Sequence, residues 1–508
     1  MLASISSATL LGVHGCPVTV EVFAGEGLPG YKIVGMPDTP CRESRDRVRA
    51  ALASSQFPWP ARNITVNLAP TSERKTGAGL DLAIAIGVLV ASGQLPADAV
   101  AGHAFLGELG LDGTLRMVPG VAPMVDSLGF ADVVLPIENS AEAHVAARGT
   151  PRVAPDLGSV VACLTGKREW DALPANPDPG PPAYVPDLAE VRGQPVARRA
   201  LEIAAAGGHH MLLIGSPGSG KTMLAQRMPS LLPPLDRDQS LETTMIHSAA
   251  GMKLPSGGLV RIPPFRAPHH TATAVAVVGG GSQQIRPGEA SLATNGVLFM
   301  DELGEFNRAA LEGLRQPLEE GVVHISRAVG RLMMPARFLL VAATNPCPCG
   351  GGPPGSCQCD DGARGRYLRR LSGPLADRFD LRVVVHRPAV DELLGAEPGE
   401  SSAVVRQRVV TARDVAFDRI GKLNAALTPD ELDLVAPLAP EARSVLRDEI
   451  ERERLTGRGY HRIRRVARTI ADLGDPGELV VTLDHVALAL SMRSSLRGPA
   501  MTDSRWIA

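Results

Sequence analysis

Short apolar runs alternate with amphipathic segments through the first third of the chain. Strands are predicted where β-branched and other apolar residues recur, at residues 18–23, 31–34 and 64–68. Residues 42–54 predict an amphipathic helix with Val48, Ala51 and Leu52 on its apolar side. Residues 81–92 (DLAIAIGVLVAS) predict a helix that is buried on all sides. This mixture indicates an α+β domain.

A proline-rich segment follows that domain. Residues 172–187 (ALPANPDPGPPAYVPD) contain six prolines, which lack a backbone donor and favour extended conformations. We therefore predict a first domain over residues 1–171 and a semi-rigid linker over residues 172–187.

The strongest pattern of the chain begins at residue 211. Apolar residues 211–214 predict a buried strand, which leads into GSPGSGKT and a helix start. This is the strand, glycine-rich turn and helix of a P-loop, whose backbone N–H groups hold phosphate oxygens of ATP. Lys221 would reach the β- and γ-phosphates, and Thr222 would ligate Mg²⁺. The predicted nucleotide-binding residues are Gly215, Ser216, Pro217, Gly218, Ser219, Gly220, Lys221 and Thr222.

Acidic residues follow a second apolar strand in the sequence GVLFMDE (residues 296–302). Ligands of open α/β sheets bind at the carboxyl ends of the strands. We predict that Asp301 holds Mg²⁺ and that Glu302 is the general base that polarises the attacking water. Asn345 ends a third apolar strand, residues 338–344, and is predicted to lie beside the γ-phosphate.

Other segments of this core have weaker patterns. Residues 308–320 predict a helix interrupted at Pro317. Residues 322–338 predict a hairpin with Arg327 and Arg331 near its tip.

Two adjacent histidines, His269 and His270, stand in the sequence FRAPHH. Neighbouring residues of a strand point to opposite faces. We therefore expect this pair to have a structural or subunit-contact role and not to bind a metal.

The C-terminal part is mostly helical by its period. Amphipathic helices are predicted over residues 404–417, 440–453 and 460–473, and a last helix over residues 480–494. Thr482 is the predicted N-cap of that last helix. Helices after an α/β core form a lid, so we predict a core over residues 188–387 and a helical lid over residues 388–508.

Composition narrows the range of partners. The net charge of −2 gives no general attraction to nucleic acid, and an aromatic content of 3% weakens any proposal of extensive base stacking. The first residues lack a basic leader region, and the longest apolar run, residues 82–91, is about half a membrane span. We expect a cytoplasmic protein with no membrane contact.

Four of the seven cysteines lie within residues 345–360, in the spacing C-x-C-x₇-C-x-C. Four thiolates from one loop could bind a structural Zn²⁺ tetrahedrally. Reversible disulfides and free thiols are the alternatives that the sequence leaves open. The residues concerned are Cys347, Cys349, Cys357 and Cys359.

A basic run follows the cysteines, and it is either a solvated face or a DNA-contacting surface. Together with the two hairpin arginines, it supplies the candidate DNA contacts. These candidates are Arg327, Arg331, Arg364, Arg366, Arg369 and Arg370.

One stretch of the first domain, NLAPTSERKTGAGLDLAIAIGVL (residues 67–89), resembles the proteolytic domain of Lon-type proteases. In those proteases the turn before the helix carries a nucleophilic serine, and here Gly79 occupies that position. Because glycine cannot attack a carbonyl, the resemblance implies the fold and argues against peptidase activity.

The motifs GSPGSGKT, FRAPHH, VVGGGS, RPGEASLATNGVLFMDE, ALEGLRQPLEEG, TNPCPCG, LSGPLADRFD and RVARTIADL together resemble the magnesium-chelatase-like AAA+ ATPases of the YifB/ComM family. The resemblance covers nearly the full chain. It implies a Lon-like first domain, an AAA+ core, a helical lid and assembly into a homo-hexamer. It also implies work on single-stranded or branched DNA, since the family includes a helicase that promotes branch migration in natural transformation.

Three residues match AAA+ roles by their order in the chain. Asn345 matches the sensor-1 residue, Arg378 the arginine finger that one subunit offers to its neighbour's nucleotide, and Arg458 the sensor-2 arginine of the lid. We therefore expect an ATP-hydrolysing DNA motor. The alternative is a protein-remodelling ATPase akin to the magnesium-chelatase ATPase subunit.

Overall fold

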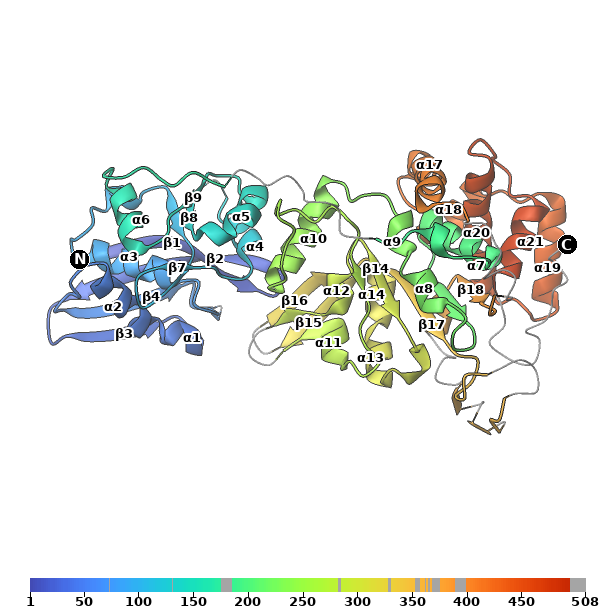
Figure 1. Cartoon of the computed structure of the whole chain (residues 1–508), viewed down its shortest axis with the longest axis horizontal. Helices are drawn as coiled ribbons and strands as arrows, with labels where there is room; N and C mark the ends of the chain where they lie inside the picture. Colours follow the sequence, from blue (N-terminus) through green and yellow to red (C-terminus); the bar gives the residue numbers. More distant parts are fainter. Residues whose placement is uncertain are drawn as a thin grey trace.

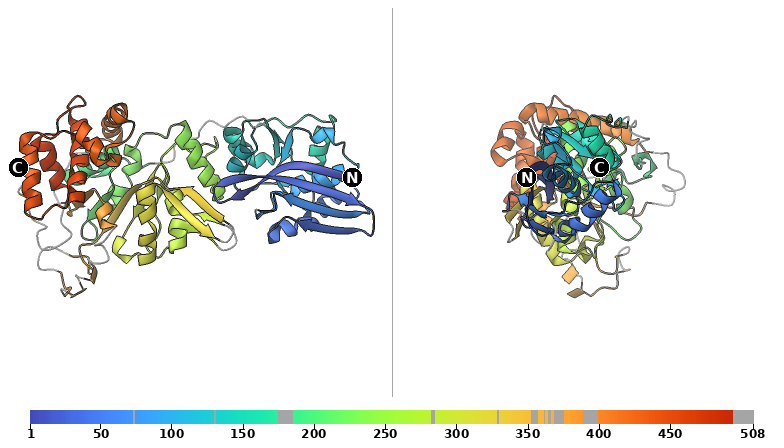
Figure 2. Two further views of the ribbon diagram at one scale, coloured as in Figure 1. Left: turned by 180° about the vertical axis from the view of Figure 1, so that it is seen from behind. Right: turned by 90° about the vertical axis from the view of Figure 1, so that its left-hand side faces the viewer.

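The computed structural model describes residues 1–72, 74–129, 131–174, 185–281, 285–327, 330–351, 357–360, 362–363, 366–367, 375–388 and 399–493. The predicted DNA contacts Arg364, Arg369 and Arg370 lie outside these residues, as does most of the predicted linker. Figure 1 shows three parts in a row: an N-terminal α/β domain, a central α/β core and a helical C-terminal part. The view from behind in Figure 2 shows the same order.

A seven-stranded sheet of order β3-β4-β2-β1-β5-β8-β9 organises the N-terminal domain. Its strands are β1 (Leu2–Leu11), β2 (His14–Gly25), β3 (Gly30–Val34), β4 (Asn63–Ala69), β5 (His103–Phe105), β8 (Asp132–Leu135) and β9 (Pro151–Val153). The sequence-based prediction misses β1, because buried polar residues interrupt its apolar alternation. Ser7, for example, is buried and donates a hydrogen bond to Phe105 O (2.6 Å).

Helices cover this sheet. They are α1 (Thr39–Arg42), α2 (Ser44–Ser54), α3 (Asp81–Ala91), α4 (Val121–Ser127), α5 (Ser140–Ala146) and α6 (Leu157–Leu164), and a short hairpin is formed by β6 (Glu108–Leu109) and β7 (Leu115–Arg116). α3 is buried at every position, as its apolar run predicts. Its first residue, Asp81, pairs with Arg47 of α2 at 2.6 Å. Burial raises the pKa of Asp81 to about 6, although this ion pair opposes the shift.

The central core is built on a five-stranded parallel sheet of order β11-β14-β17-β10-β18. Its strands are β10 (Met211–Ile214), β11 (Phe265–Arg266), β14 (Val297–Met300), β17 (Leu339–Thr344) and β18 (Leu381–Val384). Every residue of β10, β14 and β17 is buried, which confirms three predicted strands. Because all pairs are parallel, the loops after these strands meet at one edge of the sheet.

Short helices and two hairpins complete the core. They are α7 (Pro195–Gly207), α8 (Lys221–Ala225), α9 (Met228–Leu231), α10 (Arg237–Ala249), α11 (Ala274–Val278), α12 (Glu289–Leu292), α13 (Arg308–Gly313) and α14 (Arg315–Glu320), with the pairs β12 (Gly279–Gly280) and β13 (Arg286–Pro287), and β15 (Val322–Arg327) and β16 (Gly330–Pro335). The predicted interruption at Pro317 is wrong, because the helix breaks at Leu314. Pro317 lies in the first turn of α14, where a backbone N–H has no intrahelical partner to lose.

The C-terminal part is helical, as predicted. Its helices are α17 (Ser402–Ile420), α18 (Pro429–Val435), α19 (Pro440–Glu451), α20 (Gly457–Gly474) and α21 (Leu483–Ser491). Apolar residues of α17 and α20 share one buried cluster with α7 and with the strands of the core. Thr482 is the N-cap residue before α21, as predicted.

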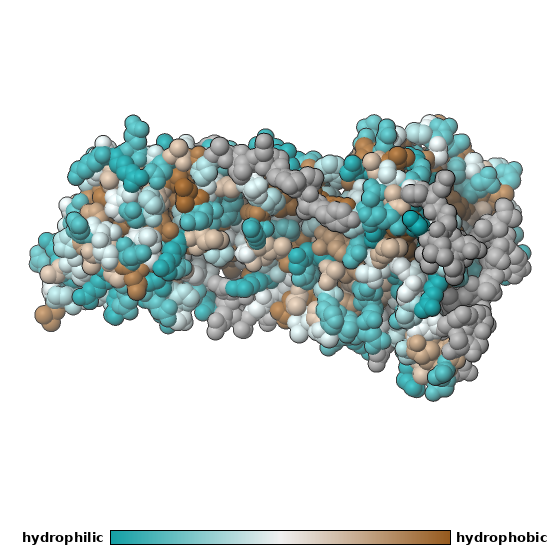
Figure 3. Space-filling view, viewed as in Figure 1, coloured by the Kyte–Doolittle hydropathy of each residue, from teal (hydrophilic) through white to brown (hydrophobic). Residues whose placement is uncertain are grey.

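The N-terminal domain contacts the core beside hairpin β15–β16 and helix α10 (Figure 1). His14 Nε2 lies 3.0 Å from Met333 O. Gly12 packs closely against Leu332, since a Cβ at this position would lie only 2.1 Å from Leu332 Cδ2. Ser248 of α10 donates to Glu142 Oε2 (2.6 Å) of the N-terminal domain. The described part of the chain has no helix with the length and apolar character needed to cross a bilayer. Figure 3 shows one face of the molecule, on which apolar side chains gather in small scattered groups.

Candidate functional site

The P-loop lies between the buried strand β10 and helix α8. Gly218 (φ 76°) and Gly220 (φ 91°) have left-handed backbone conformations, which a side chain with a Cβ adopts only at a cost in energy. These two turns bring the chain from the end of β10 to Lys221 at the start of α8.

Lys221 links the P-loop to the neighbouring strand. Its ammonium group donates to Gly215 O (2.8 Å), Ser216 O (3.0 Å) and Asn345 Oδ1 (3.2 Å). Burial lowers the pKa of Lys221, and the charges of Asp301 and Glu302 oppose this shift. The structure therefore places the predicted residues Lys221 and Asn345 together at the carboxyl edge of the sheet.

Asp301 follows β14 at the same edge. The Thr222 hydroxyl donates to Asp301 Oδ2 at 2.7 Å, and the N–H of Glu302 donates to Asp301 Oδ1 at 2.9 Å. A threonine hydroxyl and a carboxylate in contact are the oxygen ligands that Mg²⁺ prefers in proteins.

Glu302 has a histidine partner that the sequence did not reveal. His270 Nδ1 lies 3.1 Å from Glu302 Oε2, and the ring of His269 lies 4.1 Å from that of His270. The expectation that these histidines lie on a strand and diverge is wrong. β11 ends at Arg266, and the chain then turns, so that both rings lie on the same side. The backbone of Glu302 has a left-handed conformation (φ 52°), which is uncommon for a residue other than glycine.

Two further residues hold the P-loop from outside the motif. Arg387, just after β18, donates to Pro217 O at 3.2 and 2.8 Å. Gln194, before α7, donates to Ser219 O at 3.3 Å and also to His386 O. Sequence reasoning missed both, because neither has a spacing that is tied to the motif.

A cluster of arginines forms a second feature of the site. Arg378 ends a 3₁₀ turn (Ala376–Arg378) and pairs with Glu319 of α14. Burial and the positive charges of its neighbours lower the pKa of Arg378. Those neighbours are Arg462, Arg315 and Arg458.

The predicted sensor-2 residue belongs to this arginine cluster. Arg458 is exposed in the first turn of α20, and its charge acts on Arg378. The described hydrogen bonds of Lys221, by contrast, go to the P-loop and to Asn345. The site residues can therefore be described in two sets: Lys221, Thr222, Asp301 and Asn345, among which hydrogen bonds are formed, and Arg378 with Arg458, whose charges interact.

The hairpin β15–β16 is confirmed, with Arg327 opposite Gly330 next to its tip. For Arg327 and Arg331 the structure describes the backbone only. Arg366, from the predicted basic run, is exposed.

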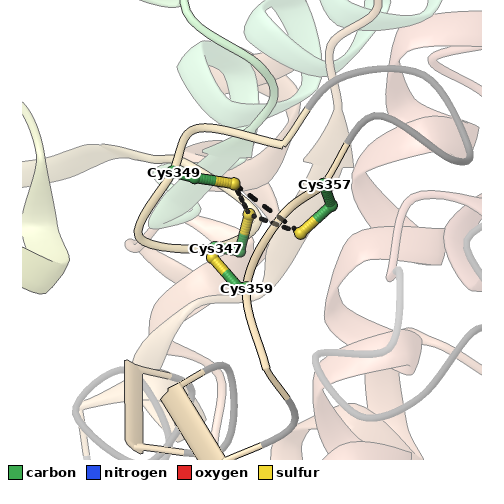
Figure 4. A group of neighbouring side chains, drawn as sticks. All are labelled: Cys347, Cys349, Cys357 and Cys359. Atoms are coloured by element: carbon green, nitrogen blue, oxygen red, sulfur yellow. Dashed lines mark hydrogen bonds between the residues drawn. The ribbon is translucent and has the colours of Figure 1, made fainter.

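The four clustered cysteines meet at one point (Figure 4). All four sulfur atoms lie within 4.8 Å of one another. Cys347 Sγ lies 3.3 Å from Cys349 Sγ and 3.5 Å from Cys357 Sγ, which is longer than a disulfide bond of about 2.05 Å. Sulfurs bound to Zn²⁺ at about 2.3 Å in a tetrahedron lie about 3.8 Å apart, so the observed group is close to the geometry of a zinc site.

The environment of the thiols differs from one to the next. Burial raises the pKa of Cys347 to about 12. Hydrogen bonds from the Gly351 backbone and from Cys347 lower the pKa of Cys349 to about 6. The cluster thus offers a thiolate at neutral pH even before a cation is considered.

The turn with Gly79 lies where the N-terminal domain meets the core. It lines a cavity of about 910 Å³ together with Arg74, Glu108, Ala250 and Arg286. Gly79, which the sequence resemblance places at the serine position of Lon-type proteases, thus lies beside a cavity that both domains line.

The fold and the site define a multidomain α/β protein with a P-loop at the carboxyl edge of a parallel sheet. Three stretches of the chain match models of known protein families. Residues 187–393 match magnesium chelatase, subunit ChlI; residues 20–139 match subunit ChlI of Mg-chelatase; and residues 399–493 match magnesium chelatase, subunit ChlI C-terminal.

Two relatives match this chain over nearly their whole length. Competence protein ComM of Haemophilus influenzae is 42% identical over 506 residues, which is 98% of each chain. YifB of Escherichia coli is 42% identical over 496 residues, which is 97% of each chain. The chain therefore belongs to the YifB/ComM family of magnesium-chelatase-like proteins. A more distant match is probable DNA helicase MCM9 of Arabidopsis thaliana, 25% identical over 213 residues, or 42% of this chain and 27% of that protein.

Proposed function

We propose that this protein is an ATP-hydrolysing AAA+ motor. The observation that carries the proposal is the meeting of Lys221, Asp301 and Asn345 at one edge of the parallel sheet. In this arrangement Lys221 neutralises the β- and γ-phosphates, and Thr222 with Asp301 holds Mg²⁺. Glu302 polarises the attacking water as general base, and Asn345 positions that water beside the γ-phosphate.

The arginine cluster supports a ring in which nucleotide is bound between subunits. Arg378 pairs with Glu319, and the positive charges of Arg462, Arg315 and Arg458 act on it as well, so this part of the surface favours the approach of a further anion. We infer that the anion is the nucleotide of the next subunit and that Arg378 is its arginine finger, an interaction worth about 10³- to 10⁵-fold in rate. Head-to-tail contacts of this kind form rings when the rotation between subunits closes, and a homo-hexamer is the expected assembly.

A mixing experiment tests the ring. Lys221→Ala subunits cannot bind phosphate but keep the finger, and Arg378→Ala subunits keep the P-loop but lack the finger. Each variant alone should lose ATP hydrolysis. A mixture should recover part of it, because some interfaces then combine an intact P-loop with an intact finger. A mixture as inactive as its components would contradict a finger acting between subunits.

We infer that the ring acts on DNA, as a helicase or branch-migration factor in recombination or natural transformation. The names of the relatives, a competence protein and a probable DNA helicase, support this. Single-stranded or forked DNA should raise ATP hydrolysis several-fold, and binding should weaken steeply with salt, because lysine and arginine contacts release counterions from the DNA. Hydrolysis that no DNA structure changes would reject the inference.

The competing function is remodelling of a partner protein, as for the magnesium-chelatase ATPase subunit. The matched family descriptions favour it. Hydrolysis that ignores DNA but rises with a partner protein purified from the same cells would establish this alternative.

We also propose that Cys347, Cys349, Cys357 and Cys359 hold a structural Zn²⁺ ion. The sulfur spacing and the soft thiolate donors fit that cation. The tag-free protein should contain close to one zinc per chain, and Cys357→Ser should lower this content, with Cys16→Ser in β2 of the N-terminal domain as the matched control. A content well below one zinc per chain would reject the site.

A further inference from the structure

Side chains of the C-terminal helices hold the backbone beside the arginine finger. We name residues 378–380 the finger loop. Arg462 of α20 donates to Arg378 O (2.9 Å) and to Asp380 Oδ1 (2.7 Å). Arg493, which follows α21, donates to Phe379 O (3.0 Å) and Asp380 O (3.2 Å). Three successive carbonyl groups of the finger loop therefore accept hydrogen bonds from arginines of the C-terminal part.

The side chain of Asp380 joins α20 to the finger loop a second time. Its Oδ2 lies 3.0 Å from His209 Nδ1, and His209 Nε2 lies 2.7 Å from Thr469 Oγ1 of α20. Asp380, His209 and Thr469 are all buried. Burial by itself would raise the pKa of Asp380. The hydrogen bond from His209 and the charge of Arg462 outweigh this effect, so the pKa is lowered overall and the group is a carboxylate at neutral pH.

The same loop is attached to the strand that carries the P-loop. The backbone N–H groups of Asp380 and Leu381 donate to His210 O at 3.0 and 3.1 Å. His210 immediately precedes β10, which ends at the P-loop. The finger loop is thus fixed on one side by the core sheet and on the other side by α20.

We propose that Arg462 is a positioning residue that makes the arginine finger follow the movement of α20. One nitrogen of its guanidinium group donates both to the carbonyl of Arg378 and to Asp380. A shift of α20 must therefore move the backbone of Arg378 or break two hydrogen bonds, one of them to a charged group. This inference rests on the proposed finger. It adds that the helical lid of one subunit sets the rate of hydrolysis in the site of the next subunit.

The test uses the full-length Arg462→Met variant, which removes the donors and keeps most of the apolar stem. Displacement of a reacting group by about 1 Å can cost about 10²-fold, so we expect kcat to fall by about 10- to 100-fold, with ATP affinity unchanged. Mixing with Lys221→Ala subunits should restore hydrolysis, because those subunits present a normal finger loop to the intact P-loop of the variant.

A matched control comes from the same helix. Arg464 donates to Leu432 O (2.8 Å) and Ala436 O (3.1 Å), which both belong to the C-terminal part. Arg464→Met should lower the unfolding temperature as Arg462→Met does, while kcat per folded ring stays near that of the unaltered protein. If Arg462→Met does not fold, Arg462→Lys is used. It keeps a positive charge near Asp380, but its shorter side chain draws the donor back from the Arg378 carbonyl, so kcat should still fall relative to the unaltered protein.

The outcomes separate this inference from the proposed function. An unchanged kcat in Arg462→Met, or a reduced kcat that Lys221→Ala subunits do not restore, overturns the positioning role. If Arg378→Ala is restored in the same mixture and Arg462→Met is not, only the inference falls. If neither variant is restored, the finger between subunits falls as well.

Discussion

His270 Nδ1 lies 3.1 Å from Glu302 Oε2, so the proposed general base has a partner that is 32 positions earlier in the chain. The two residues approach because β11 and β14 are neighbouring parallel strands and both continue beyond the same edge of the sheet. The contact fixes the direction of the carboxylate, which a general base needs in order to meet a water molecule.

The first prediction concerns this pair. Glu302→Gln should keep ATP binding and ring assembly but lower kcat by about 10²- to 10⁴-fold, the usual contribution of a general base. His270→Ala should lower kcat less, by about tenfold, with the KM for ATP unchanged, because the base remains but loses its orientation. Steady-state hydrolysis at saturating ATP measures both effects.

The double variant decides whether His270 acts through Glu302. If it does, the double variant should be no slower than Glu302→Gln alone, because His270 then has no carboxylate left to orient. Losses that multiply would instead give His270 an independent role.

The second prediction concerns the position of Arg458. Arg458 is exposed in the first turn of α20 and its charge acts on Arg378, and we predict that both arginines serve the nucleotide of the neighbouring subunit. Arg458→Ala should lower kcat and should be partly restored by Lys221→Ala subunits, as Arg378→Ala should. An arginine that served the site of its own subunit would not be restored, because every intact P-loop in that mixture would still lack it.

Local patterns were sufficient for the elements that carry the P-loop and the acidic pair. The apolar runs of β10, β14 and β17 are each followed by a chemically distinctive residue, so position in the sheet and chemistry could be predicted together. Helix α20 was equally clear, because its buried and exposed positions follow the helical period.

Local patterns could not predict contacts between segments that are far apart in the sequence. Arg387 at Pro217 and Arg462 at Asp380 are pairs separated by 170 and 82 residues, and no periodicity relates their positions. The histidine pair was misplaced for a related reason. The rule for neighbouring side chains holds only inside a strand, and β11 ends four residues before His270.

The third prediction concerns DNA binding by the hairpin. Replacing Arg327 and Arg331 by alanine should weaken binding to all sequences alike, since contacts to phosphates carry no sequence information. For single strands the slope of log K against log salt should become shallower by about 1.4, about 0.7 for each lost phosphate contact. Titration of labelled single strands at several salt concentrations measures the slope.

Arg337 provides the control for the hairpin. It follows β16, is exposed and pairs with Glu242 of α10 at 2.5 Å. Arg337→Ala removes one positive charge close to the hairpin and should leave the slope unchanged. Equal changes in slope for Arg337 and for the tip residues would show a diffuse charge effect instead of contacts at the tip.

The last prediction concerns pH and the strand that carries the P-loop. His210 Nδ1 accepts a hydrogen bond from the Leu340 N–H at 3.1 Å, which requires the unprotonated nitrogen. Burial lowers the pKa of His210 to about 4, whereas an unfolded histidine has a pKa of about 6.5.

The unfolded chain therefore takes up a proton as the pH falls through about 6.5, and the folded chain does so only near 4. His210 contributes to stability above about pH 6.5, and this contribution is lost as the pH falls through the folded pKa, with a total change of at most on the order of 3 kcal/mol. In His210→Asn, the amide oxygen can still accept from Leu340 but does not titrate. Denaturant unfolding gives the free energy of unfolding of both proteins at about pH 7 and about pH 4.5. Between these pH values the unaltered protein should lose more stability than the variant does. Parallel losses of stability in the two proteins would mean that His210 titrates alike in the folded and unfolded chains.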